Sequence, residues 1–147
     1  MTELDIQKNL FDTFCNLNSF SGIDFLRIDE NDNYLNVHFP NIQFDAPSDK
    51  RWFELTFRNN EPVDNAILGN VQNRFTGVLY IDIIITPHDV GEYEALNKYR
   101  WIAKLFNSAN IDDVDIMKVY ISTKGNEADH YRLQVAVEWT ADIDKEL

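Results

Sequence analysis

Apolar residues recur every three or four positions in two stretches of the chain, which is the spacing of one helix face. The first stretch begins beside Thr2, a residue that can cap a helix, and acidic residues follow near the positive end of the helix dipole. The second stretch covers about residues 91–106. The apolar stripes are Ile6, Leu10, Phe14 and Leu17 in the first helix, and Leu96, Tyr99, Ala103 and Phe106 in the second.

Alternation of apolar and polar residues, typical of half-buried strands, occupies much of the remaining chain. Pro40 stops one of these segments, and Gly77 interrupts another, which indicates a bulge or a close backbone approach. Polar residues predict turns at 29–33 and 123–127, and an irregular loop at 41–50. The predicted strands cover residues 23–28, 34–39, 52–58, 74–85, 117–122 and 131–139.

The order of these elements, with polar outward faces on the strands, predicts an α+β fold. We expect a mostly antiparallel sheet of about four to five strands, packed on one face by two helices. The length of 147 residues fits one domain that covers residues 1–147. The acidic tail at 142–147 is expected to fray.

The chain is strongly acidic, with a net charge of −12 from 25 acidic and 13 basic residues. Proteins that grip nucleic acid need a cationic surface, so this composition argues against tight binding of DNA. Solubility is the simpler explanation of the acidity. The alternative is a surface that lets DNA slide past without adhering, and composition does not separate the two.

Cysteine usage and the apolar runs bound the compartment. Cys15 is the only cysteine, so no intramolecular disulfide can form and structural zinc is not expected. The first residues lack the basic and apolar regions of a secretory signal, and no apolar run approaches the ~20 residues of a membrane helix. We therefore expect a soluble protein made in cytoplasm, with no membrane partner.

Motifs that carry chemistry are lacking in the sequence. The glycines form no phosphate-binding pattern, and no serine lies in a nucleophile elbow. His38, His88 and His130 are far apart, and His88-Asp89 is the one pair of interest. The acidic run at 112–115 lacks the other ligands and the glycine of a calcium loop. We therefore predict no catalytic, cofactor-binding or metal site, and no enzyme.

The strand pattern does indicate a contact surface. Trp52, Tyr80 and Tyr120, with Val78 and Ile84, lie on strand faces opposite the main apolar stripes. A second, partly aromatic face is suited to a subunit interface. A loop or helix of the same chain could equally cover it, and edge strands offer another contact surface.

Short motifs follow one another along the chain. Residues 40–47 are PNIQFDAP and precede Trp52, residues 74–77 are RFTG within a strand, and Pro87 and Gly91 precede the second helix. In this order, over about residues 1–140, they resemble the phage tail terminator family of long-tailed phages. Ala46 stands where that family often has a first proline, and the segment 23–33 is more acidic than expected.

This resemblance implies a non-enzymatic virion protein that assembles as a ring, usually six-fold, on the end of the tail tube. The ring stops tube polymerisation and presents a surface to the head-tail connector protein. Its partners are copies of itself, the tail tube protein and the connector protein, and genomic DNA passes through without specific binding. The protein would be assembled in the host cytoplasm and belong to the tail of the virion. We hypothesise that part of the acidic excess faces this channel.

Two alternatives remain beside the terminator role. The first is a tail tube subunit or head-tail connector component; a long β-hairpin and self-polymerisation would favour the tube subunit, and the sequence indicates no such hairpin. The second is a small cytoplasmic enzyme, whose site would combine His88, Asp82 and Asp89.

Loop position and exposed-face pattern suggest the contact residues. The candidate interface residues are Phe44, Asp45, Pro47, Asp49, Arg51, Trp52, Arg74, His88 and Asp89.

Overall fold

The computed structural model describes residues 3–60, 63–64, 72–86, 91–127 and 129–144, with the backbone alone at 63–64, 72–74 and 142–144. Its centre is a sheet with the strand order β1-β2-β4-β6-β5, and β3 pairs with β4 off this path. Among the described strands, only β1 and β2 pair in parallel, and the other pairs are antiparallel. The strands are β1 (Val37–His38), β2 (Arg51–Asn59), β3 (Val63–Asp64), β4 (Gln72–Ile85), β5 (Asp115–Glu127) and β6 (His130–Asp144).

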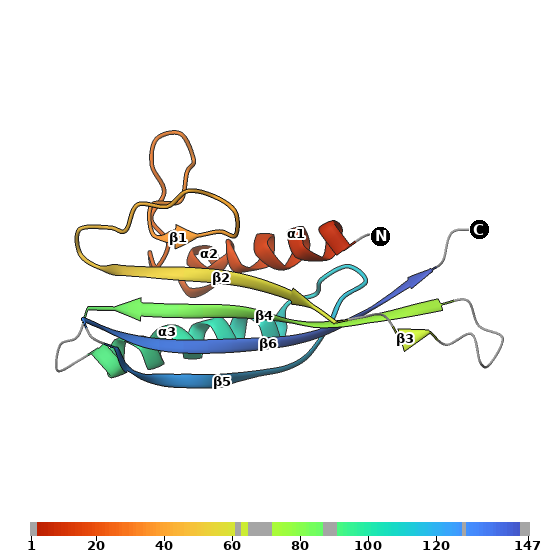
Figure 1. The fold of residues 1–147 in the computed structure, drawn as a ribbon. Helices are drawn as coiled ribbons and strands as arrows, with labels where there is room; N and C mark the ends of the chain where they lie inside the picture. The colour runs from red at the N-terminus through yellow and green to blue at the C-terminus, as the bar shows by residue number, and fades with distance from the viewer. Residues whose placement is uncertain (1–2, 61–62, 65–71, 87–90, 128, 145–147) are drawn as a thin grey trace.

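Helices cover one face of this sheet, as Figure 1 shows. They are α1 (Glu3–Phe14), the short α2 (Leu17–Ser21) and α3 (Gly91–Ser108). The apolar stripe of α1 is fully buried, and Leu17 of α2 is buried with it. The predicted α+β fold, a mostly antiparallel sheet with two helices on one face, is therefore confirmed. Strand residues of the core include Phe53, Leu55, Leu79, Ile81, Ile83, Leu133, Val135 and Val137.

The segment between α2 and β2 differs from the prediction. No strand forms at 23–28, and the predicted strand at 34–39 is reduced to Val37–His38 with an isolated bridge between Ile28 and Tyr34. The predicted alternation also fails there, because Leu35 is 49% exposed whereas Asn36 is 4% exposed.

Two asparagine side chains explain this difference. The amide of Asn36 accepts a hydrogen bond from Arg27 N at 2.8 Å and donates one to Phe25 O at 2.9 Å. Asn18 holds Leu26 in the same way, with bonds of 2.8 and 2.7 Å to its N and O. The backbone groups that a ladder would satisfy are thus satisfied by side chains, so the segment needs no partner strand.

The ends of the long strands also correct the prediction. The predicted turn at 123–127 is wrong, because β5 continues to Glu127 and pairs with β6 down to His130. The fraying expected from 142 onward is wrong for 142–144, which pair with β4. The expectation of no long hairpin is wrong too, since β5 and β6 form one and β2 and β4 pair over nine residues of each strand.

Gly77 is a position of close backbone approach and not a bulge. It pairs in register with Asn59 on one side and Trp139 on the other. A Cβ at this position would collide with the carbonyl oxygen of Arg58 and with the indole ring of Trp139. That ring stacks on Phe57 across the gap, with centroids 5.4 Å apart and an interplanar angle of 10°. The missing side chain therefore lets the indole cross β4.

Replacing Gly77 by Ala should lower the free energy of unfolding by about 1–3 kcal/mol, because backbone or indole must shift to admit the methyl group. Urea denaturation measures this. Gly125→Ala is the matched control, since a Cβ there meets nothing within 4 Å and that φ is not in the left-handed region. Equal stability of the two variants would contradict the packing described.

Candidate interaction surface

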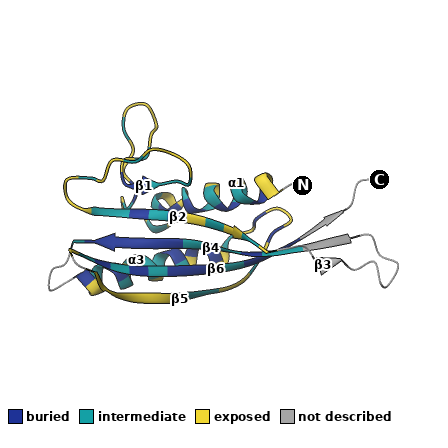
Figure 2. Ribbon diagram, viewed as in Figure 1, coloured by how far each residue is buried: buried dark blue, intermediate teal, exposed yellow. Residues whose placement is uncertain are grey.

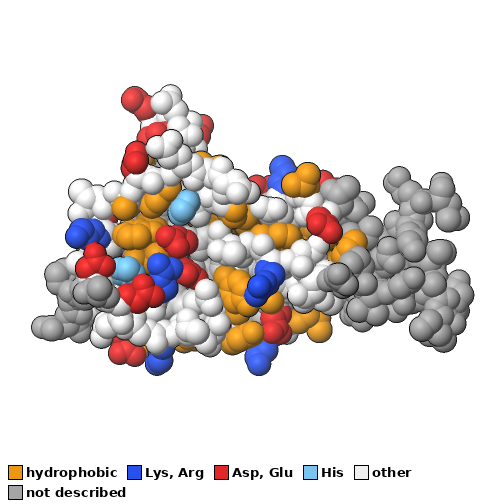
Figure 3. Space-filling model, viewed as in Figure 1, with side chains coloured by type: hydrophobic (Ala, Val, Ile, Leu, Met, Phe, Trp, Pro, Cys, Tyr) orange, Lys and Arg blue, Asp and Glu red, His pale blue; other side chains and the backbone are white. Residues whose placement is uncertain are grey.

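The sheet face opposite the helices is uncovered among the described residues. Figure 3 views this face, where hydrophobic, acidic, basic and histidine side chains gather over β2, β4 and β6. Figure 2 shows that the middle of β4 and β6 is nevertheless buried. Ile84 and Ala136 have no exposed surface although both lie outside the helix-covered core. Ile84 sits in register between Trp52 and Arg132, so large neighbouring side chains exclude water from it.

Arg132 is the centre of an ion-pair cluster on this face. Its guanidinium contacts Asp82, with Glu54 Oε2 3.2 Å from Nη1 and Glu127 Oε1 3.2 Å from Nε. Trp52 Nε1 donates to the other oxygen of Glu54 at 3.2 Å. Three carboxylates face one guanidinium, so these four groups together carry two negative charges. The cluster satisfies Arg132 and remains acidic.

These contacts shift the pKa values of the paired groups. Burial alone would raise the pKa of Glu54, but hydrogen bonds from Trp52 and Arg132 outweigh it and hold this pKa below its usual value. Burial would lower the pKa of Arg132, but the hydrogen bonds to Asp82 and Glu54 raise it. Both shifts favour the ionised forms, so the cluster is charged at neutral pH.

A row of rings runs beside the cluster, from the loop at 41–50 to the start of β6. Phe44 stacks on His38 with centroids 4.9 Å apart and lies 6.2 Å from the Trp52 ring. Trp52 is in turn 6.4 Å from the ring of His130. The His130 ring nitrogens lie 2.7 Å from Glu127 Oε2 and 2.8 Å from Asp129 Oδ1. We call His38, Phe44, Trp52 and His130 the aromatic row.

The structure brings part of the predicted interface to this row. Phe44 and Trp52 contact each other at its centre, and both are half-buried. Asp45 is exposed and Pro47 is half-buried in the same loop. Of these four residues, Phe44 and Trp52 lie side by side, and Trp52 bonds to Glu54 of the Arg132 cluster. Their role in contacts with other molecules remains a prediction.

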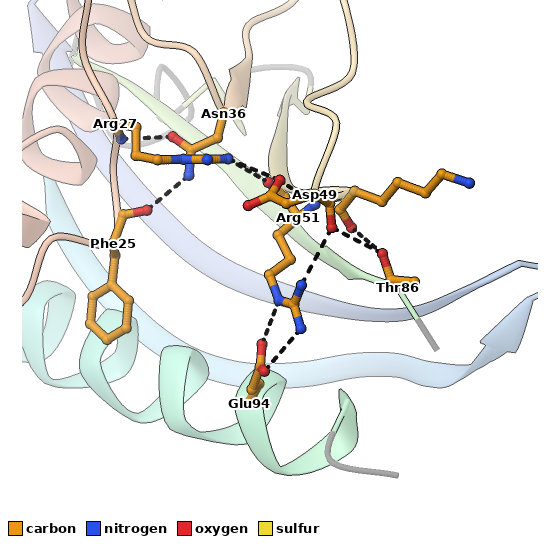
Figure 4. A network of polar contacts seen from close by, with 8 residues as sticks. Phe25, Arg27, Asn36, Asp49, Arg51, Thr86 and Glu94 are labelled. Carbon is orange, nitrogen blue, oxygen red and sulfur yellow. Dashed lines mark hydrogen bonds and ion pairs between the residues drawn. The ribbon is translucent and has the colours of Figure 1, made fainter. Parts of the chain in front are cut away.

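Two other predicted residues have partners within the chain, as Figure 4 shows. Arg51 makes two bonds to the carboxylate of Glu94 on α3, at 2.9 and 3.1 Å. Asp49 accepts from Arg27 at 3.1 Å, and its carbonyl accepts from Thr86 Oγ1 at 3.1 Å. These contacts tie the end of the loop to α3 and to the end of β4. The network fixes where the aromatic row lies.

The remaining predicted interface residues are described only in part or not at all. Arg74 lies in β4, where its backbone pairs with Val63 and Asp142, but only its backbone is described. His88 and Asp89 fall outside the described residues. The enzyme alternative required Asp82 beside them, and Asp82 is paired with Arg132.

The Arg132 cluster was not identified from the sequence, and a signal for it exists. Glu54, Asp82 and Arg132 each occupy the outward position of a strand whose other face is apolar. Glu54 lies directly opposite Asp82, and Arg132 lies two residues along β6 from Gln134, the residue opposite Asp82, so the three charges come within reach once the register is known. Pairing order and register depend on contacts between distant segments, so the strand pattern alone does not place these charges side by side.

Metal-binding clusters and membrane-spanning helices are both lacking among the described residues. Within that part of the chain, no three His, Cys, Asp or Glu side chains come close enough together to hold a metal ion. No helix among the described residues is both long and apolar enough to cross a membrane.

The fold and this face define a class of protein: a small α+β protein with one sheet face covered by helices and the other displaying an aromatic row and an acidic cluster. One solved structure with 11% sequence identity aligns over 99% of this chain and 99% of its own, with a TM-score of 0.68, which shows a shared fold. No curated protein sequence matches the chain.

A family model described as phage tail terminator protein matches residues 26–139. The chain belongs to the phage tail terminator family. Membership makes it a phage tail protein with a structural role in virion assembly, and it points to a non-enzymatic protein.

The lowered pKa of Glu54 predicts acid sensitivity. Because the pKa of Glu54 in the folded protein lies below its ordinary value, the associated stability is fully present above that ordinary value and is lost as pH falls through the folded pKa. Glu54→Gln should therefore be less stable than wild type at pH 7, and the difference should shrink on acidification. Urea denaturation at pH 7 and about pH 3.5 measures it. Glu30→Gln, at an exposed turn position, should change little at either pH. A Glu54→Gln deficit that is independent of pH would contradict the ionic role.

Proposed function

We propose that this protein caps the phage tail tube as a ring, stops its polymerisation and provides the attachment surface for the head connector. The family match over residues 26–139 carries this proposal. The uncovered sheet face supports it, because a capping subunit needs surface beyond the one that closes its own core. Assembly in the host cytoplasm, and a six-fold ring, belong to the same proposal.

A ring of identical subunits needs two different complementary patches on each copy, since head-to-tail contacts close only when the rotation between copies closes. The aromatic row suits one such patch. Half-buried aromatic residues contribute strongly to interfaces because they bury large area at little conformational cost. Phe44 and Trp52 are therefore the residues most suited to the centre of a contact.

DNA passage gives the acidic charge a role in this proposal. The chain carries a net charge of −12, and the Arg132 cluster remains negative despite its internal pairing. Acidic groups lining a channel repel phosphates over about 8 Å at physiological salt. We place part of the acidic excess at the channel, where it limits adhesion of the genome.

A tail tube subunit is the second candidate function, with a head-tail connector component beside it, and a specific observation favours the tube subunit. The long hairpins formed by β2 with β4 and by β5 with β6 are the feature by which a tube subunit would be recognised. Both hairpins are integrated in the central sheet, so they also serve the fold of a capping subunit.

Tube assembly in vitro separates the two functions. The tail tube protein of the same phage is allowed to polymerise while this protein is added, and tube lengths are measured by negative-stain electron microscopy. A terminator should shorten tubes at amounts far below those of the tube protein and appear as a ring at tube ends. Incorporation along the tube, or filaments of this protein alone, would establish the tube subunit instead.

Phe44→Ala should reduce this capping because it removes the centre of the aromatic row and leaves the apolar core intact. The same tube-length measurement gives the result, and circular dichroism verifies folding. Tyr93→Ala, which removes a ring that is 76% exposed on α3, is the control and should cap like wild type. Full capping by Phe44→Ala would exclude the aromatic row from the contact.

A further inference from the structure

The outer edge of β2 carries backbone groups whose direction can be derived from two hydrogen bonds. Phe53 N donates to Asn36 O at 2.9 Å, away from β4, whereas Asn60 N donates to Thr76 O at 2.8 Å, toward β4. Backbone groups of successive strand residues point to alternate sides. The N–H and C=O groups of Leu55, Phe57 and Asn59 therefore point outward, on the side of β1.

β1 covers only the beginning of this edge, and the reason is Pro40. The register pairs Val37 with Phe53 and His38 with Glu54. In a parallel ladder the next donor of β1 would be the N–H of residue 40, and proline has none. The ladder stops there. No described residue hydrogen-bonds the outward groups of Phe57 and Asn59, and a hollow of about 240 Å³ adjoins the edge, lined in part by Pro40, Leu55 and Phe57.

The other edge of the sheet, formed by β5, is less suited to accept a further strand. β5 also has no described strand on its outer side, but register shifts interrupt its pairing with β6 between Ile116 and Lys118 and between Ile121 and Thr123. Bulges and lysines are devices that protect an edge from pairing. The stretch Leu55–Asn59 pairs with β4 without any register shift. The edge of β2 is therefore the one suited to accept a further strand.

The chain itself presents a strand of the required kind. β5 pairing ends at Asp115 with Thr140, whereas β6 continues to Asp144. Residues 141–144 are thus paired with β4 on one side only, and Figure 1 shows them projecting with the start of β4 beyond the end of β2. We call residues 141–144 the arm. No other described strand lies on its free side.

We propose that the arm of one copy adds as a strand to the β2 edge, Leu55–Asn59, of a second copy of this chain. The sequence of the arm, Ala-Asp-Ile-Asp, alternates apolar and acidic residues. The β2 edge alternates the apolar Leu55 and Phe57 with Thr56 and the exposed Arg58. The Arg58 guanidinium has no carboxylate partner among the described residues, so an acidic arm complements it in charge.

Donor and acceptor lie on different strands, so the contact is head-to-tail and can close into a ring. This inference rests on the proposed ring and specifies one of its contacts. It adds main-chain hydrogen bonds, which give affinity without requiring a particular side chain. It also assigns Pro40, within the PNIQFDAP motif, the task of keeping the edge open.

Disulfide trapping tests the contact. In a Cys15→Ser background, Arg58→Cys and Asp142→Cys are introduced together, and the full-length protein is oxidised with copper phenanthroline over a range of concentrations. The expected result is a ladder of cross-linked species above the dimer on non-reducing gels. Each single-cysteine variant can yield at most a dimer. Lys118→Cys with Asp142→Cys, on the protected β5 edge, is the matched control and should give no ladder.

Asn59→Pro supplies a second measurement. Proline removes the outward N–H and leaves the bonds to β4 in place, so native mass spectrometry should show roughly tenfold weaker self-association. Rings that persist in wild type without cross-linking between positions 58 and 142 would overturn this inference and leave the capping function intact. Absence of any cross-link in a protein that stays monomeric at all concentrations would overturn it too. Loss of tube capping in a protein that still cross-links would instead sink the proposed function.

Discussion

One-sided covering of the sheet is the constraint on which the rest of this structure depends. The helices exclude water from one face, where isoleucine, leucine, valine and phenylalanine side chains of β2, β4 and β6 meet α1 and α3. The opposite face must then meet solvent or a partner through what it displays. On this face, Ile84 and Ala136 are buried under larger neighbours, and charged side chains gather around Arg132. A face of this kind is soluble alone and also offers rings and charges for contact.

A few contacts outside this face determine where its aromatic side chains lie. The bonds from Arg51 to Glu94 and from Arg27 to Asp49 fasten the end of the 41–50 loop, and that loop carries Phe44 to the side of Trp52. Burial of Asn36 holds the preceding segment. The proposed contact surface is thus located by contacts that do not themselves face outward, which is how a rigid scaffold supports a binding loop.

The sequence predicted the fold better than the site. Helical stripes and long alternating strands identify α1, α3, β2, β4 and β6, because periodicity reports burial directly. It failed at 23–39, where Asn18 and Asn36 replace a ladder with side-chain bonds that no apolar pattern reveals. It also failed at 123–127, where the polar residues of an exposed edge strand resemble a turn. Of the predicted site residues, Phe44 and Trp52 meet, but the Arg132 cluster depends on a strand register that one sequence does not specify.

The amide clamps of Asn18 and Asn36 have a consequence for how the molecule responds to its surroundings. An amide neither gains nor loses a proton in the range where carboxylates do, and its bonds to backbone are barely screened by ions. The hydrogen bonds that hold the chain between α2 and β2 are therefore insensitive to pH and ionic strength, whereas the charges of the neighbouring surface depend on both. A change of pH or ionic strength, as between a cell and the exterior, would alter the charges on this face while the backbone behind them keeps its shape.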